Sequence, residues 1–568
     1  MTWSVPPRRA LLLAAALLSG CAAAGTPSPG LQGIARAESV FGTYLSGRFA
    51  QSETDTEAAA DRLLEALRRD PDEPEVLNRA FAAALLDGRA EAQRLARRLP
   101  QNQAAALLLV GSEALAGRWA QAEQRVRALP RQGPAQLLQP LLLAWVQQGL
   151  GQTDAALATL RPLAEAGRLR GLHALHMALI ADLAGRPREA ERAMRTALAE
   201  TPEPTLRLLQ LATAVLARSG RDAEAMRLVD GLSRGLSDYA LAAGTEAARR
   251  ALLEARSVAS PVEGIAEAYH ALAAALRPQG ANDAALILAR LALRLRPDFG
   301  PTLLLIAENY AEERHPESAL RVLGQVPPGD ALAPVVALRR AALFDRMDRV
   351  PEAEQALRGL AEALPAAPQP LVRLGDLFRA RSRFPEAVTA YDQAAARIPE
   401  ARSSDWPLFY ARGIANERAG NWPRAEADFQ RALELAPEQP YVMNYLAYTW
   451  VEQGRDLPAA RRMLERAVEL RPNDGNIVDS LGWALFRMGD IPGAIRWLER
   501  AVELEPRNSV INDHLGDAYW RAGRQQEARF QWSRALGLEP EPDDLAKITA
   551  KLRDGLPESP AATAQRTD

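Results

Sequence analysis

The chain has 568 residues, more than one ordinary hydrophobic core accommodates, so length alone predicts several domains or a repeat array. Apolar residues make up 48% of the chain but aromatic residues only 5%, and Ala, Leu, Arg and Glu dominate, which favours an all-α protein. The 69 basic and 71 acidic side chains nearly cancel, which argues against binding to a polyanion such as nucleic acid. The single cysteine excludes an intrachain disulfide and a thiolate metal cage.

The first twenty residues have the layout of a signal peptide. Arg8 and Arg9 precede an apolar run from Ala10 to Leu18, which is too short to cross a bilayer as a helix. Small residues then lead to Cys21 in the sequence Leu-Ser-Gly-Cys, which resembles the bacterial lipoprotein signal. The resemblance implies cleavage before Cys21 and a lipid-modified, acylated cysteine that anchors the mature chain. The alternative is an ordinary secretory signal with an incidental cysteine.

The residues after the cysteine predict a destination and a linker. Ala22, and not Asp, follows Cys21, and the sorting rule that the lipoprotein resemblance implies then favours the outer membrane. Two prolines and several glycines in residues 21–33 predict a flexible linker between the lipid and the folded body. We therefore expect a signal peptide at 1–20, the lipidated cysteine and linker at 21–33, and a body on the periplasmic face of the outer membrane.

A repeat of about 34 residues dominates the rest of the chain. Residues 478–485 and 512–519 align, and each segment is followed at matching spacing by Ala, a bulky residue, Ala and Pro, which resembles the tetratricopeptide pattern. An alanine of the expected second helix recurs at positions 285, 319, 353, 387, 425, 460, 494 and 528, and weaker copies lie at 59, 92, 122, 156, 190 and 225. The expected fold is an all-α tetratricopeptide-repeat solenoid, a superhelix of antiparallel helix pairs that share one core.

One interval in this series is irregular. Ala225 and Ala285 are 60 positions apart, and between them Ser260 followed by Pro261 and Glu263 has the pattern of a capped helix start. We therefore expect two consecutive arrays, an N-terminal divergent array at 34–259 and a C-terminal array at 260–540. A capping helix at 541–556 and a disordered tail at 557–568 should follow.

The sequence favours binding over catalysis. It contains no Gly-Xaa-Ser-Xaa-Gly elbow, phosphate-cradling loop or His-Glu-Xaa-Xaa-His pair, and the repeats leave no stretch long enough for a catalytic core. His173 and His176 could share a metal, but two ligands are too few, so helix packing is the preferred interpretation. Asn473-Asp474-Gly475 is expected to be a turn between repeats and not a cation loop. We expect no enzyme activity, no cofactor and no metal.

The first helix of each repeat should line a concave groove, in which residues one and four positions from the packing glycine face a partner. In the three best-formed repeats the candidate groove residues are Asn444, Tyr448, Asp479, Trp483, Arg487, Asp513, Asp517, Trp520 and Arg521. Trp450 and Trp532 fall at core positions, and an equal alternative for Trp483 and Trp520 is that they merely fill better-packed repeats. The acidic residues among the candidates suit a partner with basic and apolar features.

The signal, the linker and the blocks at 446–449, 479–483 and 514–517 together resemble a family of proteobacterial tetratricopeptide outer-membrane lipoproteins. The resemblance implies an adaptor that binds a periplasmic carboxyl-terminal-processing protease and delivers cell-wall hydrolases to it. The alternative from another class is a structural scaffold of an envelope assembly, for polysaccharide export or outer-membrane biogenesis. The expected partners are proteins, with membrane contact through the lipid anchor only and with neither nucleic acid nor a small-molecule substrate.

Overall fold

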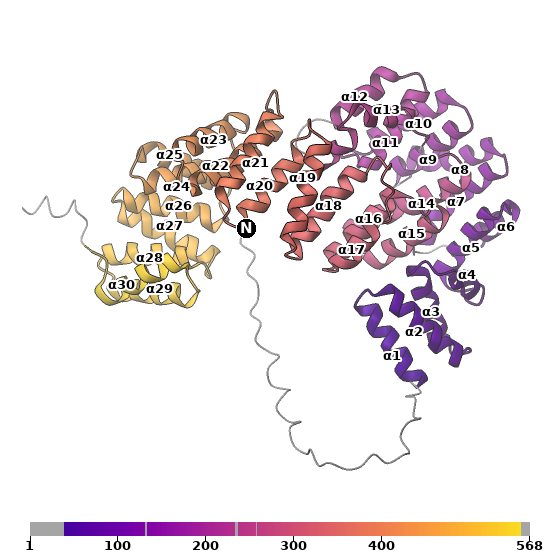
Figure 1. Cartoon of the computed structure of the whole chain (residues 1–568), viewed down its shortest axis with the longest axis horizontal. Helices are drawn as coiled ribbons and strands as arrows, with labels where there is room; N and C mark the ends of the chain where they lie inside the picture. The colour runs from indigo at the N-terminus through magenta and orange to yellow at the C-terminus, as the bar shows by residue number, and fades with distance from the viewer. Residues whose placement is uncertain (1–38, 131–132, 168, 233–236, 257, 558–568) are drawn as a thin grey trace, which may run out of the picture. The chain divides into compact units, whose positions relative to one another are not determined.

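The computed structural model describes residues 39–130, 133–167, 169–232, 237–256 and 258–557 (Figure 1). The predicted signal peptide, Cys21, the linker at 21–33 and residues 558–568 of the predicted tail lie outside the described residues. Every regular element within the described ranges is helical, which confirms the all-α fold. The chain divides into two compact units, residues 1–92 and 93–568.

Short connections join the helices. The first unit holds α1 (Val40–Ser52), α2 (Thr56–Arg69) and α3 (Pro74–Leu86), and α4 (Glu91–Ala96) crosses the division between the units. The second unit continues with α5 (Gln103–Leu115), α6 (Trp119–Arg127), α7 (Gly133–Gly149), α8 (Thr153–Ala166), α9 (Arg170–Leu183), α10 (Pro187–Ala199), α11 (Leu206–Arg218), α12 (Asp222–Leu232), η1 (Asp238–Ala243), α13 (Glu246–Glu254), α14 (Pro261–Leu276) and η2 (Arg277–Gln279). It ends with α15 (Asn282–Leu295), α16 (Gly300–Glu312), α17 (Pro316–Leu323), α18 (Ala333–Arg346), α19 (Val350–Ala363), α20 (Gln369–Arg379), α21 (Phe384–Ala396), η3 (Ser403–Asp405), α22 (Trp406–Arg418), α23 (Trp422–Leu435), α24 (Pro440–Glu452), α25 (Leu457–Leu470), α26 (Gly475–Arg487), α27 (Ile491–Leu504), α28 (Ser509–Arg521), α29 (Gln525–Gly537) and α30 (Pro542–Asp554).

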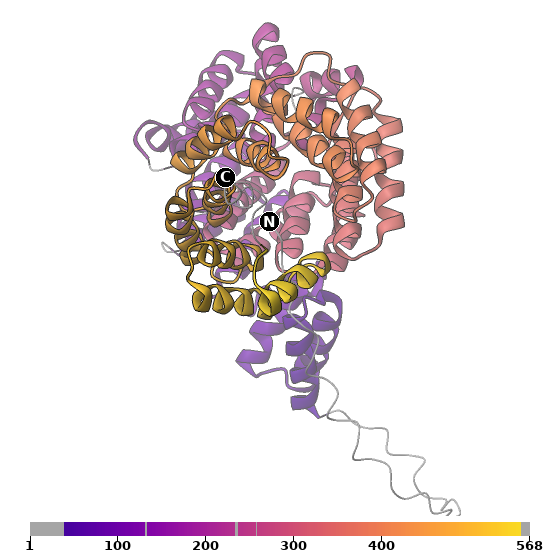
Figure 2. The same cartoon turned by 90° about the vertical axis from the view of Figure 1, so that its left-hand side faces the viewer.

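From α5 to α12, and again from α14 to α29, successive helices pack as pairs and each pair packs on the next, as the orange-to-yellow helices of Figure 2 show. In the best-formed repeats the pairs are α24–α25, α26–α27 and α28–α29. The alanine series of the sequence marks the second helix of each pair. All fourteen of these alanines, from Ala59 to Ala528, are buried, with at most 1% of their surface exposed. The 34-residue period is therefore the period of the helix pairs.

Local sequence explains where the helices of a pair begin and end. The Asp474 side chain caps α26 by accepting a hydrogen bond from the Ile477 backbone N–H at 3.3 Å, so the predicted turn is a helix cap. Asp490 caps α27 through the Gly493 N–H at 3.0 Å, and a proline occupies its first turn. Between them Gly489 has φ 85°, a left-handed conformation that glycine adopts without strain.

Small residues let the paired helices approach closely. A Cβ atom at Gly482 of α26 would lie 2.7 Å from Leu498 Cγ of α27. In the next pair, a Cβ atom at Gly516 would lie 2.4 Å from Trp532 Nε1. Trp532 is fully buried, as predicted from its core position, whereas Trp450 is half-buried. A large side chain on the second helix thus fills the space that the glycine leaves on the first.

The irregular interval contains η1 and α13, which interrupt the series of pairs. The predicted helix start is confirmed, because α14 begins at Pro261 and the Ser260 hydroxyl accepts a hydrogen bond from the Glu263 N–H at 3.2 Å. Glu263 also accepts a bond from the N–H of Ala259, the residue before the cap, at 3.0 Å. The boundary expected between two repeat arrays at residues 259 and 260 lies inside the second compact unit, and the division into two arrays stays a prediction.

Helix α14 connects the two predicted arrays. It packs against α5, α7 and α9, the first helices of three successive pairs, and also against α15 of its own pair. Tyr269 of α14 is fully buried and donates its hydroxyl hydrogen to the Leu107 carbonyl of α5 at 2.9 Å. A Cβ atom at Gly264 would lie 2.3 Å from the ring of Trp145 in α7. A single helix therefore packs along the first helices of three successive pairs.

A buried polar cluster lies along the same helix. Arg207 of α11 donates two hydrogen bonds to Glu267 of α14, with Nη2 2.6 Å from Oε2 and Nε 3.1 Å from Oε1. The side chains of this pair are only 14% and 1% exposed. Burial alone would raise the pKa of Glu267, but Arg207 outweighs burial and holds that pKa below its ordinary value. His270 pairs with the Thr302 hydroxyl at 3.0 Å, and Trp145 donates to His176 Nδ1 at 2.9 Å.

None of the helices in the described ranges combines the length and the apolar character needed to cross a bilayer. Helix α30 packs against α29 and lies within the range 541–556 that was expected for a capping helix.

The close approach of paired helices predicts opposite effects for two glycine substitutions. Gly516→Ala should lower the free energy of unfolding by about 1–3 kcal/mol, because the new methyl group collides with a fixed indole. Gly359→Ala in α19 is the matched control and should raise it by about 0.5–1 kcal/mol, because nothing lies within 4 Å and alanine favours helix. Urea unfolding followed by circular dichroism would measure both, and equal effects would contradict the close packing at Gly516.

The polar cluster also predicts a loss of stability in acid. Burial lowers the pKa of His176 and of His270 to about 4, below the value of about 6.5 expected in the unfolded chain. Their contribution is therefore complete above pH 6.5 and is lost as the pH falls towards 4. Between pH 7 and pH 5 each histidine should remove about 2 kcal/mol of stability. In urea unfolding at the two pH values, His270→Gln should show a smaller pH dependence than the wild type, and an unchanged pH dependence would contradict this assignment.

Candidate functional site

The candidate groove residues lie on α24, α26 and α28, the first helices of three successive pairs. Tyr448, Trp483 and Trp520 are half-buried, and Arg487 is exposed. Two of the candidate carboxylates, Asp479 and Asp517, are almost fully buried, with 5% and 4% of their surface exposed. The aromatic candidates therefore remain accessible, and these two acids do not.

Trp483 is the centre of an aromatic cluster. Its ring stacks on the His514 imidazole of α28, with centroids 4.0 Å apart and planes at 12°. It also stacks on Phe486, with centroids 4.9 Å apart and planes at 15°. Its indole N–H donates to Glu452 Oε1 of α24 at 2.6 Å, and Arg487 Nη1 lies 3.2 Å from the same oxygen. The indole is thus fixed in one orientation by contacts from three helices.

Asp479 is already paired inside the protein. His514 Nδ1 lies 3.0 Å from Asp479 Oδ2 and 3.1 Å from Oδ1. Burial opposes protonation of His514, but the adjoining carboxylate outweighs burial and raises the pKa of the imidazole. The Asp479 carboxylate therefore stabilises the stacking of α26 on α28 and does not face a partner.

Asp513 and Asp517 are paired as well, with a lysine of the C-terminal helix. Lys551 Nζ of α30 lies 2.8 Å from Asp513 Oδ2 and 2.8 Å from Asp517 Oδ2. Asp517 Oδ1 also accepts a hydrogen bond from the Trp532 indole at 2.9 Å. Burial and the neighbouring Asp513 carboxylate raise the pKa of Asp517, and Lys551 opposes this rise. Both acids therefore fix α30 to the last repeat, which leaves them unavailable to the basic partner that the sequence favoured.

The end of α30 also covers the other two candidates of the last repeat. A Cβ atom at Gly555 would lie 2.1 Å from Trp520 Cζ2, so the backbone runs directly over this indole. Arg521 donates from Nη2 to the Pro557 carbonyl. Trp520 and Arg521 are consequently partly covered by the segment that follows α30.

The remaining candidates, Asn444 and Tyr448, lie on α24, the helix whose Glu452 bonds to Trp483. Burial raises the pKa of the Tyr448 hydroxyl, and the carboxylates of Glu452 and Asp479 raise it further. Asn444 Oδ1 is buried and has no hydrogen-bond partner among the described residues. We use the term aromatic strip for the surface formed by Tyr448, Glu452, Trp483 and Arg487. Among the described residues, this surface combines Glu452 with three predicted groove residues that are at least partly accessible.

The groove prediction missed three residues: Glu452, His514 and Lys551. Glu452 lies four positions after Tyr448, one helical turn further on the same face, so helical spacing could have identified it. Lys551 is one of two lysines in the chain, and both lie in α30, an unusual placement in a protein whose basic residues are otherwise all Arg. His514 gives no local signal, because its partner Asp479 is 35 positions away.

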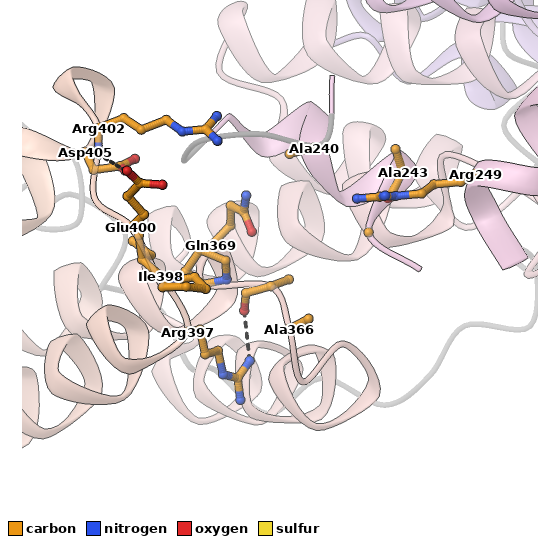
Figure 3. Close-up of a pocket in the computed structure, with 14 residues that line it drawn as sticks. Ala240, Ala243, Arg249, Ala366, Gln369, Arg397, Ile398, Glu400, Arg402 and Asp405 are labelled. Carbon is orange, nitrogen blue, oxygen red and sulfur yellow. Dashed lines mark hydrogen bonds between the residues drawn. The ribbon is translucent and has the colours of Figure 1, made fainter. Parts of the chain in front are cut away.

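A second concave feature lies elsewhere in the second unit (Figure 3). It is a cavity of about 360 Å³ between η1, the residues before α20 and the segment 397–405. Arg397 Nη1 donates to the carbonyls of Ala361, Leu364 and Ala367, at 3.2, 3.1 and 2.8 Å, and thereby fixes one wall. Arg402 and Arg249 lie on opposite sides of the cavity in Figure 3. Its described lining has no Ser, Thr, Cys, Lys or His, so it offers a polar surface and no nucleophile of these types.

The two histidines that could have shared a metal have packing roles. His173 Nδ1 lies 2.8 Å from the Leu169 carbonyl, and His176 receives the Trp145 indole hydrogen. In the described ranges no three His, Cys, Asp or Glu side chains are grouped as metal ligands would be. The arrangement of the site supports binding through an aromatic surface.

Comparison with known proteins identifies the repeats. The family model for the tetratricopeptide repeat matches residues 410–475, 452–509 and 480–540, which together cover α22 to α29. A TPR repeat-containing protein of Pseudomonas aeruginosa is 27% identical over 179 residues. That alignment covers 31% of this chain and 30% of the relative, so the chain spans less than a third of the length of the protein it matches.

Two of the solved structures that are similar to this chain are a bacterial tetratricopeptide repeat protein and an APC/C hetero-tetramer. A tetratricopeptide repeat protein from Parabacteroides merdae is 15% identical and covers 44% of this chain and 98% of its own, with a TM-score of 0.37. The Cut9–Hcn1 hetero-tetramer of the APC/C is 14% identical and covers 91% of this chain and 96% of that one, with a TM-score of 0.38. The helix pairs with their buried alanine series make an all-α solenoid fold, and the family match identifies residues 410–540 of it as tetratricopeptide repeats.

Proposed function

We propose that this protein is a lipid-anchored adaptor on the periplasmic face of the outer membrane, and that the aromatic strip on α24 and α26 binds its protein partner. Tetratricopeptide arrays act by presenting an extended surface to other proteins. The sequence around Cys21 supports the anchor, and the repeats between residues 410 and 540 support the binding role.

The binding site is inferred from a difference between the first helices of the repeats. Some of these helices are covered by other parts of the chain, and others are not. In the N-terminal part, α5, α7 and α9 are packed against α14, so the chain itself occupies them. In α28, Lys551 pairs with Asp513 and Asp517, and residues 555–557 lie over Trp520 and Arg521. On α24 and α26 the aromatic strip is left with Tyr448 and Trp483 accessible.

The chemistry of the strip indicates the kind of partner segment that it binds. Trp and Tyr contribute large rigid surfaces, and together with Arg they are the residue types that dominate binding energy at interfaces. Glu452 and Arg487 form a 3.2 Å ion pair beside the indole, and their side chains are 44% and 33% exposed, so both can exchange bonds with a partner. A segment with an apolar side chain beside polar backbone groups fits this surface better than a strongly basic one, because the buried acids are already neutralised.

The adaptor role extends this proposal to two particular partners. An anchored array that holds a carboxyl-terminal-processing protease and a cell-wall hydrolase together raises their effective concentration without new chemistry. The support for this particular pair of partners is the family resemblance of the signal, linker and repeat blocks. If the captured proteins belonged instead to an envelope assembly, they would indicate that the chain is a structural scaffold of that assembly.

Substitutions in the strip should test the binding site. Trp483→Ala and Tyr448→Ala should each weaken partner binding by about 2 kcal/mol, because both remove rigid aromatic contact surface. The measurement is crosslinking and capture in cells from a benzophenone placed at Arg487, followed by mass spectrometry and by titration of the captured proteins. Phe530→Ala on α29 is the control, since Phe530 is 61% exposed but lies outside the strip.

We expect the wild type to capture a protease and a hydrolase. This capture should be lost in both strip variants and retained in the control. Thermal unfolding of each variant separates lost binding from lost folding, since Trp483 also stacks on His514. Capture that is unaffected by both strip variants would show that the rings of Tyr448 and Trp483 do not contribute to binding.

The anchor has a separate test. Cys21→Ser should move the protein from the outer-membrane fraction to the soluble periplasmic fraction, because no acyl chain can then be attached. Mass spectrometry of the N-terminal peptide should show diacylglycerol and an amide-linked acyl chain on Cys21 of the wild type. An unmodified Cys21 at that position would exclude the anchor.

A further inference from the structure

Helix α1, the first indigo helix in Figure 1, carries an exposed apolar stripe. Phe41, Leu45 and Phe49 are spaced four residues apart and are 68%, 45% and 68% exposed. Residues at this spacing lie on one side of a helix. The opposite side packs on α2: a Cβ atom at Gly47 would lie 2.7 Å from Leu63 Cγ. The stripe is therefore the side of α1 that faces away from its own pair.

The two ends of the repeat series differ in this respect. Repeat proteins need a polar outer surface on their terminal helices to stay soluble. At the C-terminal end, α30 has the sequence PDDLAKITAKLRD, and Leu545 is its one exposed large apolar side chain, at 47%. At the N-terminal end, α1 exposes two phenylalanines and a leucine. The stripe is thus not an ordinary solvated cap.

The chemistry of this face fits a bilayer surface. Aromatic and leucine side chains on one side of a helix favour the boundary between lipid headgroups and acyl chains. Arg48 lies on the same exposed part of α1, and α1 contains no acidic residue in its sequence VFGTYLSGRFAQS. A single cation without a neighbouring carboxylate on the helix suits the anionic headgroups of a membrane.

The position of α1 in the chain supplies the reason for such a contact. Val40 follows Cys21 by 19 positions, so α1 stays within about 65 Å of the acylated cysteine. A tether of this length turns a weak surface contact into a local one with a high effective concentration. We propose that the Phe41–Leu45–Phe49 face of α1 lies on the lipid bilayer as a second membrane contact. This proposal rests on the lipid anchor proposed above.

The experiment replaces the native anchor, so that it does not depend on acylation. A chain of residues 22–568 carries a hexahistidine tag in place of Cys21 and is held on nickel-chelating vesicles of phosphatidylethanolamine and phosphatidylglycerol. Because Cys21 is the only cysteine, Ser46→Cys on the exposed side of α1 provides a unique site for an environment-sensitive dye. Brominated lipids in the same vesicles quench the dye only where α1 enters the bilayer surface.

On vesicles, we expect the emission of the dye to shift to the blue and to be quenched by the brominated lipids. Both effects should be lost in the triple variant Phe41→Ser/Leu45→Ser/Phe49→Ser. Each such side chain contributes enough apolar surface to change membrane partitioning roughly tenfold. Phe530→Ser is the matched control and should leave the quenching unchanged. Circular dichroism of the triple variant, whose buried residues Thr43, Gly47 and Ala50 are retained, verifies that α1 still folds on α2.

Three results would overturn the proposal. The first is a tethered protein whose dye is not quenched. The second is a dimer that forms without vesicles and is abolished by the triple substitution, which would assign the stripe to a second copy of the chain. The third is a dye that is shielded from water in the absence of vesicles and becomes exposed when residues 22–38 are removed. This result would show that residues 22–38 cover the stripe. Failure of the anchor is seen separately, as an unmodified Cys21 in the native protein.

Discussion

The structure depends on one packing constraint: a helix pair of this length cannot bury its apolar side alone, so each pair must be covered by the next. The small-against-large contacts of Gly482 with Leu498 and of Gly516 with Trp532 bring the two helices of a pair close enough to make one shared core. Because every pair is covered by a neighbour, the helices at the two ends of a series each have one side that no further pair covers. At one end, the uncovered side of α30 is mostly polar. At the other end, α1 exposes phenylalanines.

The irregular interval shows how the same constraint can be satisfied by a distant segment. The residues from η1 to α13 interrupt the pairs, and α14 then packs on α5, α7 and α9 as well as on its own partner α15. Its polar contacts are specific: the Tyr269 hydroxyl reaches the Leu107 carbonyl, and Glu267 accepts two bonds from Arg207. A buried ion pair of this kind costs desolvation, and its loss on one side leaves an uncompensated charge, so it fixes which surfaces meet. The first helices of these three pairs are therefore covered by the chain itself.

The sequence predicted the elements better than the site, for a physical reason. The alanine and glycine positions identify close helix contacts, and such contacts recur at a period that one sequence can show; all fourteen alanines and Trp532 are buried as expected. The cap of α14 at Ser260 was predictable because it is local. The acidic groove residues were not, since their surroundings depend on other repeats: Asp479 meets His514 from the next pair, and Asp513 and Asp517 meet Lys551 from beyond the last one. Helical spacing places a side chain on a face but does not show what covers that face.

These pairings change what kind of surface the protein offers. Had the three acids been free, the groove would attract basic partners over a distance, and salt would weaken that attraction. With His514 and Lys551 in place, the aromatic strip is left with one ion pair and two large rings, so affinity should depend on contact surface and shape more than on charge. Such surfaces bind slowly in solution unless the partner is kept nearby. A chain held to a membrane by an acylated cysteine and by the face of α1 would confine this surface to the periplasmic boundary, where a locally high concentration replaces electrostatic attraction.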